Sequence, residues 1–409
     1  MGLQPVAISP GITWVGVLDP ALRVFDIIME TEYGTSYNSY LVRGSKGTAL
    51  VETVKENFAD EFLARLRAVV DPQLIDFVVC NHTEPDHTGA LLRVLEAAPK
   101  ATVLASETGV RFLRDMFRVD FPVRAVRDGE EVDLGGRTLR FIGAPFLHWP
   151  DSMFTYVPED AVLFTCDVFG AHYADERVFD DAMGDFAGAQ RYYFEVLFSP
   201  FRKHLLTALE KIQNLPLSVI APSHGPVLRR EPRQYVDRYA AWTREEAPSE
   251  KKRVVVLYVS SYGSTEKLAR AIASGIGEAG VDVELINGRE TTPLAVMHRV
   301  DAADGLLVGS PTFNGRAVST IWWLLGLVTP IVNRGKPAAA FGSYGWSGEA
   351  AYQIEDFLKG MRFDIVQEPL RVRQKPSEDD LAAAEAFGRR FATSVLQAEA
   401  KKVSGEGSS

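Results

Sequence analysis

The chain has 409 residues, of which 46% are hydrophobic and 24% charged, and its formal net charge is −10. This length predicts two or more domains, and the acidic balance argues against a nucleic-acid backbone as partner. Membrane attachment is not expected, because no run approaches the roughly eighteen apolar residues of a membrane-spanning helix. The first residues lack the basic and apolar regions of a signal peptide, so the sequence predicts a cytoplasmic enzyme or carrier.

The sequence contains two cysteines, Cys80 and Cys166, each inside an apolar, strand-like run. Two cysteines are too few for a disulfide framework. Neither belongs to a Cys-x-x-Cys pair of the kind that zinc ribbons and rubredoxin-type iron sites use. The sequence therefore argues against all three of these cysteine-based structures.

The first 225 residues alternate expected strands with expected helices. Residues 1–55 are predicted to be mainly β structure, with a turn at 44–47 between two short β-prone runs. A helix is expected around 62–70, because its apolar residues recur at helical spacing. The other elements expected here are strands at 75–80, 101–104, 138–142, 153–157, 162–166 and 217–221, and helices at about 88–97, 106–117 and 205–212. The alternation predicts an α+β or α/β sandwich with one site along a strand-end edge.

The composition changes at 244–252, where a polar, charged stretch predicts a linker. After it, strands are expected at 254–259, 281–286, 305–308 and 338–341, with helices between them. This regular alternation predicts a doubly wound α/β sheet. The predicted organisation is a first domain at 1–248, a second at 249–400 and a polar, disordered tail at 401–409.

The stretch NHTEPDH, residues 81–87, directly follows the apolar run that ends at Cys80. In an α/β sheet, this arrangement offers side chains at the carboxyl end of a strand. Four potential metal ligands fall within six positions: His82, Glu84, Asp86 and His87. A polar turn with an aspartate cap on the next helix is the alternative, but the density of ligands favours half of a metal site.

Three residues that also follow expected strands, His148, Asp167 and His224, predict the other half. Each alone could have a structural, hydrogen-bonded role. Three or four ligands are enough for one ion, so seven suffice for two if one carboxylate, such as Asp167, bridges them. A two-zinc hydrolase would be expected to favour histidine at position 84, whereas Glu84 gives mixed imidazole and carboxylate ligation, which suits iron that binds a small gas. His172 could support these ligands through contacts with them, without binding metal itself.

Three loops in the second half predict a flavin site. The sequence SSYGST, residues 260–265, opens a helix after an expected strand, where backbone N–H groups and hydroxyls can hold a phosphate. It is neither a Walker loop nor Gly-x-Gly-x-x-Gly, which disfavours a dinucleotide, and a simple capped helix is the alternative. Loops 309–315 and 342–348 could enclose a flat ring at the same sheet edge, so FMN is predicted. The expected contacts are Ser260, Tyr262, Gly263, Ser264, Thr265, Ser310, Pro311, Thr312, Phe313, Asn314, Gly315, Ser343, Tyr344, Gly345, Trp346 and Gly348.

With these motifs, essentially the whole chain resembles the flavodiiron proteins, also called A-type flavoproteins. The resemblance is carried by HTEPDH with its glutamate, by the spaced His148, Asp167 and His224, and by the stretches GTSYNSYLV, HWPDSMFTY, SSYGST, SPTFNG and SYGWSG. It implies a metallo-β-lactamase-like αββα sandwich followed by a flavodoxin-like doubly wound parallel sheet.

The same resemblance implies FMN and two non-haem irons. Electrons from an external donor, a rubredoxin-like protein or reduced deazaflavin, would reduce O2 to water or NO to N2O. It also implies a head-to-tail homodimer or a dimer of dimers, and His87 is not a ligand in every member of the family. The implied ligand sets are His82, Glu84, His148 and Asp167 for one iron, and Asp86, His87, Asp167 and His224 for the other, with Asp167 bridging.

Two other functions compete with this one. A zinc hydrolase fused to a flavodoxin-like electron-carrier module could use the same histidines, but Glu84 argues against it. A non-enzymatic electron carrier would leave the seven potential ligands unexplained. The residues do not decide between O2 and NO, although O2 is slightly favoured. Tyr193, a candidate catalytic residue, or Tyr173 could influence the preference.

Overall fold

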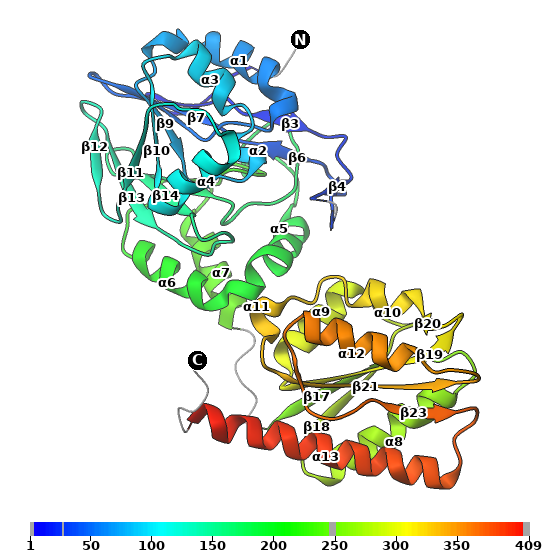
Figure 1. Cartoon of the computed structure of the whole chain (residues 1–409). Helices are drawn as coiled ribbons and strands as arrows, with labels where there is room; N and C mark the ends of the chain where they lie inside the picture. Colours follow the sequence, from blue (N-terminus) through cyan, green and yellow to red (C-terminus); the bar gives the residue numbers. More distant parts are fainter. Residues whose placement is uncertain (1–3, 27, 245–250, 404–409) are drawn as a thin grey trace. The chain divides into compact units, whose positions relative to one another are not determined.

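The computed structural model describes residues 4–26, 28–244 and 251–403, and the chain forms two compact units, Met1–Glu245 and Glu246–Ser409 (Figure 1). Each unit has its own sheets and its own hydrophobic core. Most of the linker expected at 244–252 lies outside the described residues. None of the helices in the described part of the chain combines the length and hydropathy of a bilayer span.

Two sheets form the centre of the first unit (Figure 1). The larger has the order β1-β2-β7-β8-β9-β10-β11, and the smaller has the order β12-β13-β14-β15-β16. Two short antiparallel pairs, β3 with β6 and β4 with β5, complete the unit. The strands are β1 Val6–Ser9, β2 Ile12–Trp14, β3 Val17–Asp19, β4 Val24–Phe25, β5 Met29–Glu30, β6 Thr35–Tyr37, β7 Tyr40–Arg43, β8 Thr48–Val51, β9 Phe77–Cys80, β10 Thr102–Ser106, β11 Val123–Val126, β12 Glu131–Asp133, β13 Thr138–Gly143, β14 Met153–Val157, β15 Val162–Cys166 and β16 Val219–Pro222.

The two sheets pack face to face because their strands are apolar on both sides. In β9, Val79 packs between the sheets with Phe141 and Phe164 of the smaller sheet, whereas Val78 and Cys80 belong to the core on the other face. Successive side chains of a strand point to opposite faces, so a continuous apolar run can fill both layers. The predicted αββα sandwich is therefore confirmed.

Helices cover the outer faces of the sandwich. They are α1 Ala59–Arg67, α2 Pro85–Thr88, α3 Leu91–Ala97, α4 Glu107–Phe117, α5 Ala187–Tyr193, α6 Arg202–Ile212 and α7 Arg233–Arg244, with short helical turns at Glu56–Phe58, Pro72–Leu74, Phe194–Phe198 and Ser199–Phe201. The expected start of α4 is confirmed, since Ser106 Oγ accepts a hydrogen bond from Gly109 N at 3.0 Å. The single helix expected up to Ala97 is wrong, because the chain is interrupted between α2 and α3, where Gly89 packs directly against the backbone of Glu56.

The second unit is one twisted sheet with helices on both faces. The order β18-β17-β19-β21-β22 is 2-1-3-4-5 in chain order, the flavodoxin-like arrangement. The elements are β17 Arg253–Tyr258, α8 Ser264–Glu278, β18 Asp282–Asn287, α9 Pro293–Ala302, β19 Gly305–Phe313, β20 Arg316–Ala317, α10 Ser319–Leu324, α11 Pro330–Asn333, β21 Pro337–Tyr344, α12 Ala350–Gly360, β22 Asp364–Ile365, β23 Leu370–Arg373 and α13 Glu378–Val403.

The predicted start of the disordered C-terminal tail is wrong, because it lies too early in the chain. Helix α13 continues to Val403, whereas a disordered tail was expected from Lys401. Lysine and alanine are good helix formers, so the polar character of these residues does not end the helix. Residues 404–409 lie outside the described part of the chain.

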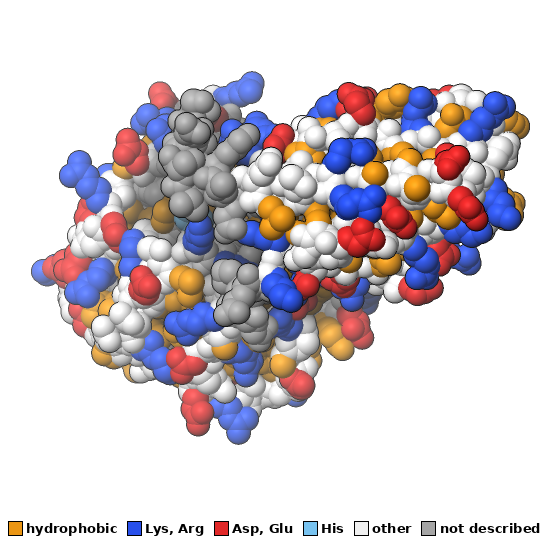
Figure 2. Space-filling view, turned by 90° about the horizontal axis from the view of Figure 1, so that it is seen from below, with side chains coloured by type: hydrophobic (Ala, Val, Ile, Leu, Met, Phe, Trp, Pro, Cys, Tyr) orange, Lys and Arg blue, Asp and Glu red, His pale blue; other side chains and the backbone are white. Residues whose placement is uncertain are grey.

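Charged side chains of both signs are interspersed over the face of the molecule in Figure 2. This distribution agrees with the modest net charge of −10.

Candidate metal and flavin sites

The turn after β9 carries four of the predicted metal ligands. Pro85 begins α2, a position that favours proline because its fixed φ suits the first helical turn. Glu84 therefore lies just before the helix, while Asp86 and His87 lie on its first turn. The side chains of His82 and His87 are buried, with 0% and 2% of their surface exposed.

Three other segments bring the remaining predicted ligands to the same place. His148 lies in the loop after β13, Asp167 directly follows β15, and His224 lies just beyond β16. Strands β15 and β16 are parallel, so their carboxyl ends lie at the same edge of the sheet. Cys166 adopts a φ of +52°, an uncommon conformation for a residue other than glycine, and it turns the chain between β15 and Asp167.

The seven residues form two groups that share one carboxylate. In the first group, Glu84 Oε2 lies 3.1 Å from His82 Nε2 and 3.1 Å from His148 Nε2. In the second, Asp86 Oδ2 lies 3.0 Å from His224 Nε2 and 3.5 Å from His87 Nε2. Each group thus combines imidazole nitrogens with carboxylate oxygens at distances that one metal ion could span.

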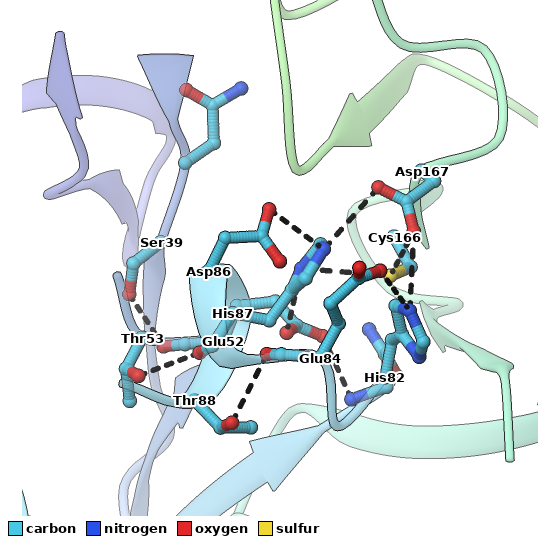
Figure 3. A network of polar contacts seen from close by, with 12 residues as sticks. Ser39, Glu52, Thr53, His82, Glu84, Asp86, His87, Thr88, Cys166 and Asp167 are labelled. Carbon is cyan, nitrogen blue, oxygen red and sulfur yellow. Dashed lines mark hydrogen bonds and ion pairs between the residues drawn. The ribbon is translucent and has the colours of Figure 1, made fainter. Parts of the chain in front are cut away.

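Asp167 faces both groups (Figure 3). Its Oδ2 lies 3.9 Å from His82 Nε2 in the first group. Its Oδ1 lies 3.3 Å from His87 Nε2 and 3.4 Å from His224 Nε2 in the second. One carboxylate with each oxygen directed at a different set of ligands has the geometry of a bridge between two ions.

The outward nitrogens of three histidines have acceptors that the sequence did not identify. Asp151 Oδ2 lies 3.3 Å from His82 Nδ1 and also accepts a hydrogen bond from the backbone N–H of Thr83. The backbone oxygen of Ser36 lies 2.6 Å from His224 Nδ1. The third acceptor is Glu52, whose Oε2 lies 3.4 Å from the Nδ1 of His87. Such partners orient ligating imidazoles in many metal sites.

Only some of these three acceptors could have been identified from the sequence. Glu52 directly follows the apolar strand β8 and is 1% exposed, so its position resembled that of the predicted ligands. Asp151 lies within the stretch HWPDSMFTY, but its contact with residue 82 depends on tertiary packing. The Ser36 acceptor is a backbone carbonyl, which no residue type can reveal.

Tyr193 and His172 lie beside the second group. The hydroxyl of Tyr193 donates a hydrogen bond to Asp167 Oδ1 at 3.0 Å. His172 lies behind the ligands, as expected for a supporting residue, because its ring contacts Tyr193 and His224 and its Nδ1 lies 2.9 Å from Thr35 Oγ1. Tyr193 is followed directly by a π-helical turn, a feature that is frequent at functional sites.

The second unit contains a cavity of about 430 Å³ where β17, β19 and β21 end, within the roughly 300–1,000 Å³ of small-molecule sites. It lies where the strand order reverses between β17 and β19, the place at which open α/β sheets bind ligands. Gly263, with a φ of +81°, starts α8 at this edge. The aromatic side chains of Tyr262 and Phe313 line the cavity while being 98% and 65% exposed.

Most of the predicted flavin contacts line this cavity. They are Ser260, Tyr262, Gly263, Ser264, Thr265, Pro311, Thr312, Phe313, Ser343, Tyr344 and Gly345. The residues that line it without having been predicted are Ser261, Lys267, Gln374 and Lys375. The last two follow β23, a short strand that was not among the predicted elements.

Five predicted contacts are not among the residues that line the cavity, namely Ser310, Asn314, Gly315, Trp346 and Gly348. Ser310 is buried, and its Oγ accepts a hydrogen bond from Val318 N. Asn314 and Gly315 form the tight turn between β19 and β20, both at positive φ. Trp346 is 91% exposed, and Gly348 packs against the ring of Tyr344.

Comparison with known proteins decides the family. Residues 35–225 match the model described as ODP family beta lactamase, and residues 256–388 match that of flavodoxin. The type A flavoprotein fprA of Rhodobacter capsulatus is 46% identical over 402 residues, which cover 95% of this chain and 91% of that protein. The chain belongs to the type A flavoprotein, or flavodiiron, family.

Two further flavodiiron relatives match nearly the full length of this chain. A protein named nitric oxide reductase from Moorella thermoacetica is 39% identical and covers 96% of this chain and 99% of that protein. The solved structure of rubredoxin oxygen:oxidoreductase from Desulfovibrio gigas has a TM-score of 0.73 at 31% identity, covering 97% of this chain and 100% of that one. Flavodiiron proteins are oxidoreductases that contain FMN and a non-haem diiron site, as the sequence predicted.

The residues of this flavodiiron chain are suited to a pair of metal ions. Asp86 Oδ1 is buried and has no hydrogen-bond donor among the described residues, and Oδ2 faces the ring nitrogens of two other predicted ligands, His224 and His87. A bound cation would satisfy both oxygens of this buried carboxylate. The donor set of four imidazoles and three carboxylates contains no thiolate ligand, which suits iron better than a soft metal.

The electrostatics of the protein without metal also indicate a cation site. Burial tends to lower the pKa of His82, but hydrogen bonds to Asp151 and Glu84 raise it to about 10. For His224, the opposing effect of burial is likewise exceeded by contacts with Asp167 and Asp86, which raise its pKa to about 9. Positive charge is therefore strongly favoured in this position.

The second unit of the flavodiiron chain offers a cradle for a phosphate and a flat ring. Hydroxyls of Ser260, Ser264 and Thr265 lie at the start of α8, where the helix dipole favours an anion. Lys267 and Lys375 add positive charge to the lining of the cavity. The exposed aromatic rings beside this cradle provide apolar surface for an isoalloxazine ring.

Proposed function

We propose that this protein is a flavodiiron reductase of O2 and NO, in which the seven clustered residues hold two irons and the cavity of the second unit holds FMN. The observation that carries the proposal is Asp167, whose two oxygens face two different groups of imidazoles and carboxylates. This arrangement requires a pair of ions, and Glu84, which stands where a two-zinc hydrolase would be expected to have histidine, favours iron over zinc. When bound, the flavin supplies electrons one at a time, and the iron pair supplies adjacent open positions at which O2 becomes water or two NO become N2O and water.

The ligand assignment follows from the two groups. His82, Glu84 and His148 would hold the first iron, and Asp86, His87 and His224 would hold the second, with Asp167 available to both. Glu84 and His148 are the most accessible of these groups, with 16% and 17% of their side chains exposed. We therefore propose that a small gas would reach the site from the partly exposed side that Glu84 and His148 form.

The surrounding residues keep the ligands in place and limit access of water. Asp151 and the Ser36 carbonyl hold the outward nitrogens of His82 and His224, so that the other nitrogen of each ring is free for metal. The ring of Trp149 packs edge-on against that of His82, with centroids 5.0 Å apart. Of these contacts, the Trp149 ring supplies an apolar wall beside the polar centre, which would limit the entry of water.

We also propose that Tyr193 influences the reaction through Asp167. Its hydroxyl donates to the Asp167 oxygen that faces His87 and His224. Burial and then the Asp167 charge raise the pKa of Tyr193 well above its usual value, so the hydroxyl keeps its proton. A hydrogen bond to this oxygen lowers the negative charge available to the second iron.

The proposed function can be tested by measuring anaerobic NO consumption and O2 consumption with one chemically reduced donor. We expect both activities and two irons per chain, with O2 slightly favoured. Two zinc ions and no iron in protein grown without added zinc would instead support a hydrolase. A His148→Asn variant that kept FMN and consumed gas at the original rate would support a simple electron carrier.

We further propose that the protein works as a head-to-tail homodimer, or a dimer of such dimers, and receives electrons from a separate donor. The metal site and the flavin cavity lie in different units of the chain, and a head-to-tail pair would bring the flavin of one copy to the irons of another. A rubredoxin-like protein is the proposed donor, supported by the name of the Desulfovibrio gigas relative, with reduced deazaflavin as the other candidate.

Mixing two inactive variants tests the dimer. One variant, His148→Asn, is expected to lack a working metal site, and the other, Gly263→Val, is expected to bind FMN weakly and is dialysed free of it before mixing. In a head-to-tail dimer, a mixed pair contains one complete combination of sites, so activity should reappear after subunit exchange. If the mixture stays inactive although mass spectrometry detects mixed dimers, each chain uses its own flavin and the head-to-tail arrangement is wrong.

A further inference from the structure

The imidazole of His87 lies between two different sets of groups. Its Nε2 faces the second metal group, 3.5 Å from Asp86 Oδ2 and 3.3 Å from Asp167 Oδ1. Its Nδ1 faces away from that group, toward Glu52 Oε2 at 3.4 Å and Cys166 Sγ at 3.8 Å. The protonation of one nitrogen therefore decides whether the other can bind metal.

Glu52 is the stronger acceptor of the two groups behind His87. A carboxylate accepts a hydrogen bond more strongly than a thiol sulfur does. The Glu52 side chain is 2% exposed, and its Oε2 has no hydrogen-bond donor within standard geometry among the described residues. The Nδ1–H of His87 is the donor placed to satisfy it, after a shortening of a few tenths of an ångström.

The other oxygen of Glu52 is already occupied. Its Oε1 accepts a hydrogen bond from the backbone N–H of Asn81 at 2.7 Å, next to His82 in the same turn. Glu52 itself has a φ of +62°, so its backbone is held in an uncommon conformation by its surroundings. Figure 3 shows Glu52 and His87 together with Asp86 and Asp167.

We propose that Glu52 is a positioning residue that keeps the proton of His87 on Nδ1 and thereby makes its Nε2 a ligand of the second iron. This inference rests on the proposed diiron site and adds to it the residue that determines whether His87 takes part. Without the Glu52 carboxylate, His87 can place its proton on Nε2, where Asp86 and Asp167 would accept it. The second iron would then lose one of its ligands.

A Glu52→Gln variant tests the proposal with little change in side-chain volume. The glutamine has one carbonyl oxygen, which can accept from Asn81 N or from His87 Nδ1 but cannot serve both as the carboxylate does. If the oxygen stays with Asn81, the amide NH2 faces His87 Nδ1 and favours the tautomer that cannot bind metal. Ser39→Ala is the matched control, because Ser39 Oγ donates to the backbone oxygen of Glu52 at 2.7 Å and its removal leaves the Glu52 carboxylate intact.

The measurement is an anaerobic titration of the metal-free, FMN-containing full chain with Co(II), followed by visible absorption. The wild-type chain should bind two ions. In Glu52→Gln, we expect the affinity for one ion to stay within about threefold and that for the other to fall about 10–100-fold, the usual effect of losing an outer partner of a ligating histidine. Ser39→Ala should bind both ions as the wild type does.

A double variant separates an effect through His87 from a general loss of structure. If Glu52 acts through His87, then Glu52→Gln combined with His87→Ala should bind the second ion no more weakly than His87→Ala alone. Full two-ion affinity in Glu52→Gln, or additive weakening in the double variant, would overturn the inference. A wild-type chain that failed to bind two ions would instead contradict the proposed diiron function itself.

Discussion

The hydroxyl of Tyr193 donates a hydrogen bond to Asp167 Oδ1 at 3.0 Å, so a group that binds no metal modifies the carboxylate that both metal groups share. A Tyr193→Phe variant should keep two irons and FMN, because the ring and its packing remain. A hydrogen bond to a charged group contributes about 1.5–3 kcal/mol, so we expect turnover with O2 or NO to fall at least about tenfold.

The neighbouring tyrosine provides the control for this prediction. Tyr192 has a hydroxyl that accepts a hydrogen bond from Glu30 N at 3.3 Å, and it lines a surface cavity that His172 also lines. Tyr192→Phe should therefore retain normal turnover. Equal activity of Tyr193→Phe and wild type, with equal iron content, would show that the hydrogen bond to Asp167 has no role in the reaction.

Replacement of Glu84 by histidine should change the metal. Glu84 Oε2 lies 3.1 Å from both His82 Nε2 and His148 Nε2, so its carboxylate is central to the first group. A histidine there would remove the hard oxygen donor and produce the ligation that zinc prefers. We expect Glu84→His to gain zinc, lose iron and lose reductase activity, as measured by elemental analysis and gas consumption. Retention of two irons with full turnover would show that another residue sets the metal preference.

The histidines and acids that follow strands could be predicted from the sequence because each is marked by a local pattern. His82, Glu84 and their neighbours directly follow an apolar strand, and the same is true of Asp167. The supporting residues could not be found in this way. Asp151 acts on His82 from a loop 69 positions further along the chain, a pairing that only the packed sandwich creates.

The flavin loops show a second limit of local patterns. Residues 310–315 were expected to contact the flavin, but the chain forms a tight hairpin between β19 and β20 that carries Asn314 and Gly315 away from the cavity lining. Conversely, Gln374 and Lys375 line the cavity from the end of a short strand that was not among the predicted elements. A turn residue such as glycine predicts a bend, while the direction of the chain after the bend depends on hydrogen bonds with distant segments.

Metal loading should depend on pH, because protons compete for the same nitrogens. In the protein without metal, the pKa of His82 is raised to about 10 and that of His224 to about 9, so both rings are protonated at neutral pH. Their ion pairs stabilise the metal-free fold below the ordinary histidine pKa, and this contribution is lost as the pH rises through 9 to 10. Metal needs the neutral rings.

The affinity of the metal-free chain for Fe(II) should therefore increase between pH 6 and 8, by up to about tenfold per pH unit for each proton displaced. Anaerobic calorimetry in two buffers with different ionisation enthalpies would measure the number of protons released. An affinity that is independent of pH over this range would show that the histidines are already neutral in the metal-free protein.

FMN binding should depend on Gly263 through its backbone conformation. Gly263 has a φ of +81°, and a Cβ at this position would meet no atom within 4 Å. Gly263→Val would thus cause strain without a clash, costing roughly 1–2 kcal/mol, and it would shift the first turn of α8 beside the cavity. Gly280, with a φ of +80° and an equally open Cβ position, lies just beyond the other end of the same helix and provides the control.

We expect Gly263→Val to lower FMN affinity at least about tenfold, as measured by flavin fluorescence. Gly280→Val should lower only thermal stability, as measured by melting in the presence of excess FMN. Equal loss of FMN affinity in both variants would mean that the strain acts through the stability of α8, and that the loop at 260–265 has no direct part in holding the phosphate.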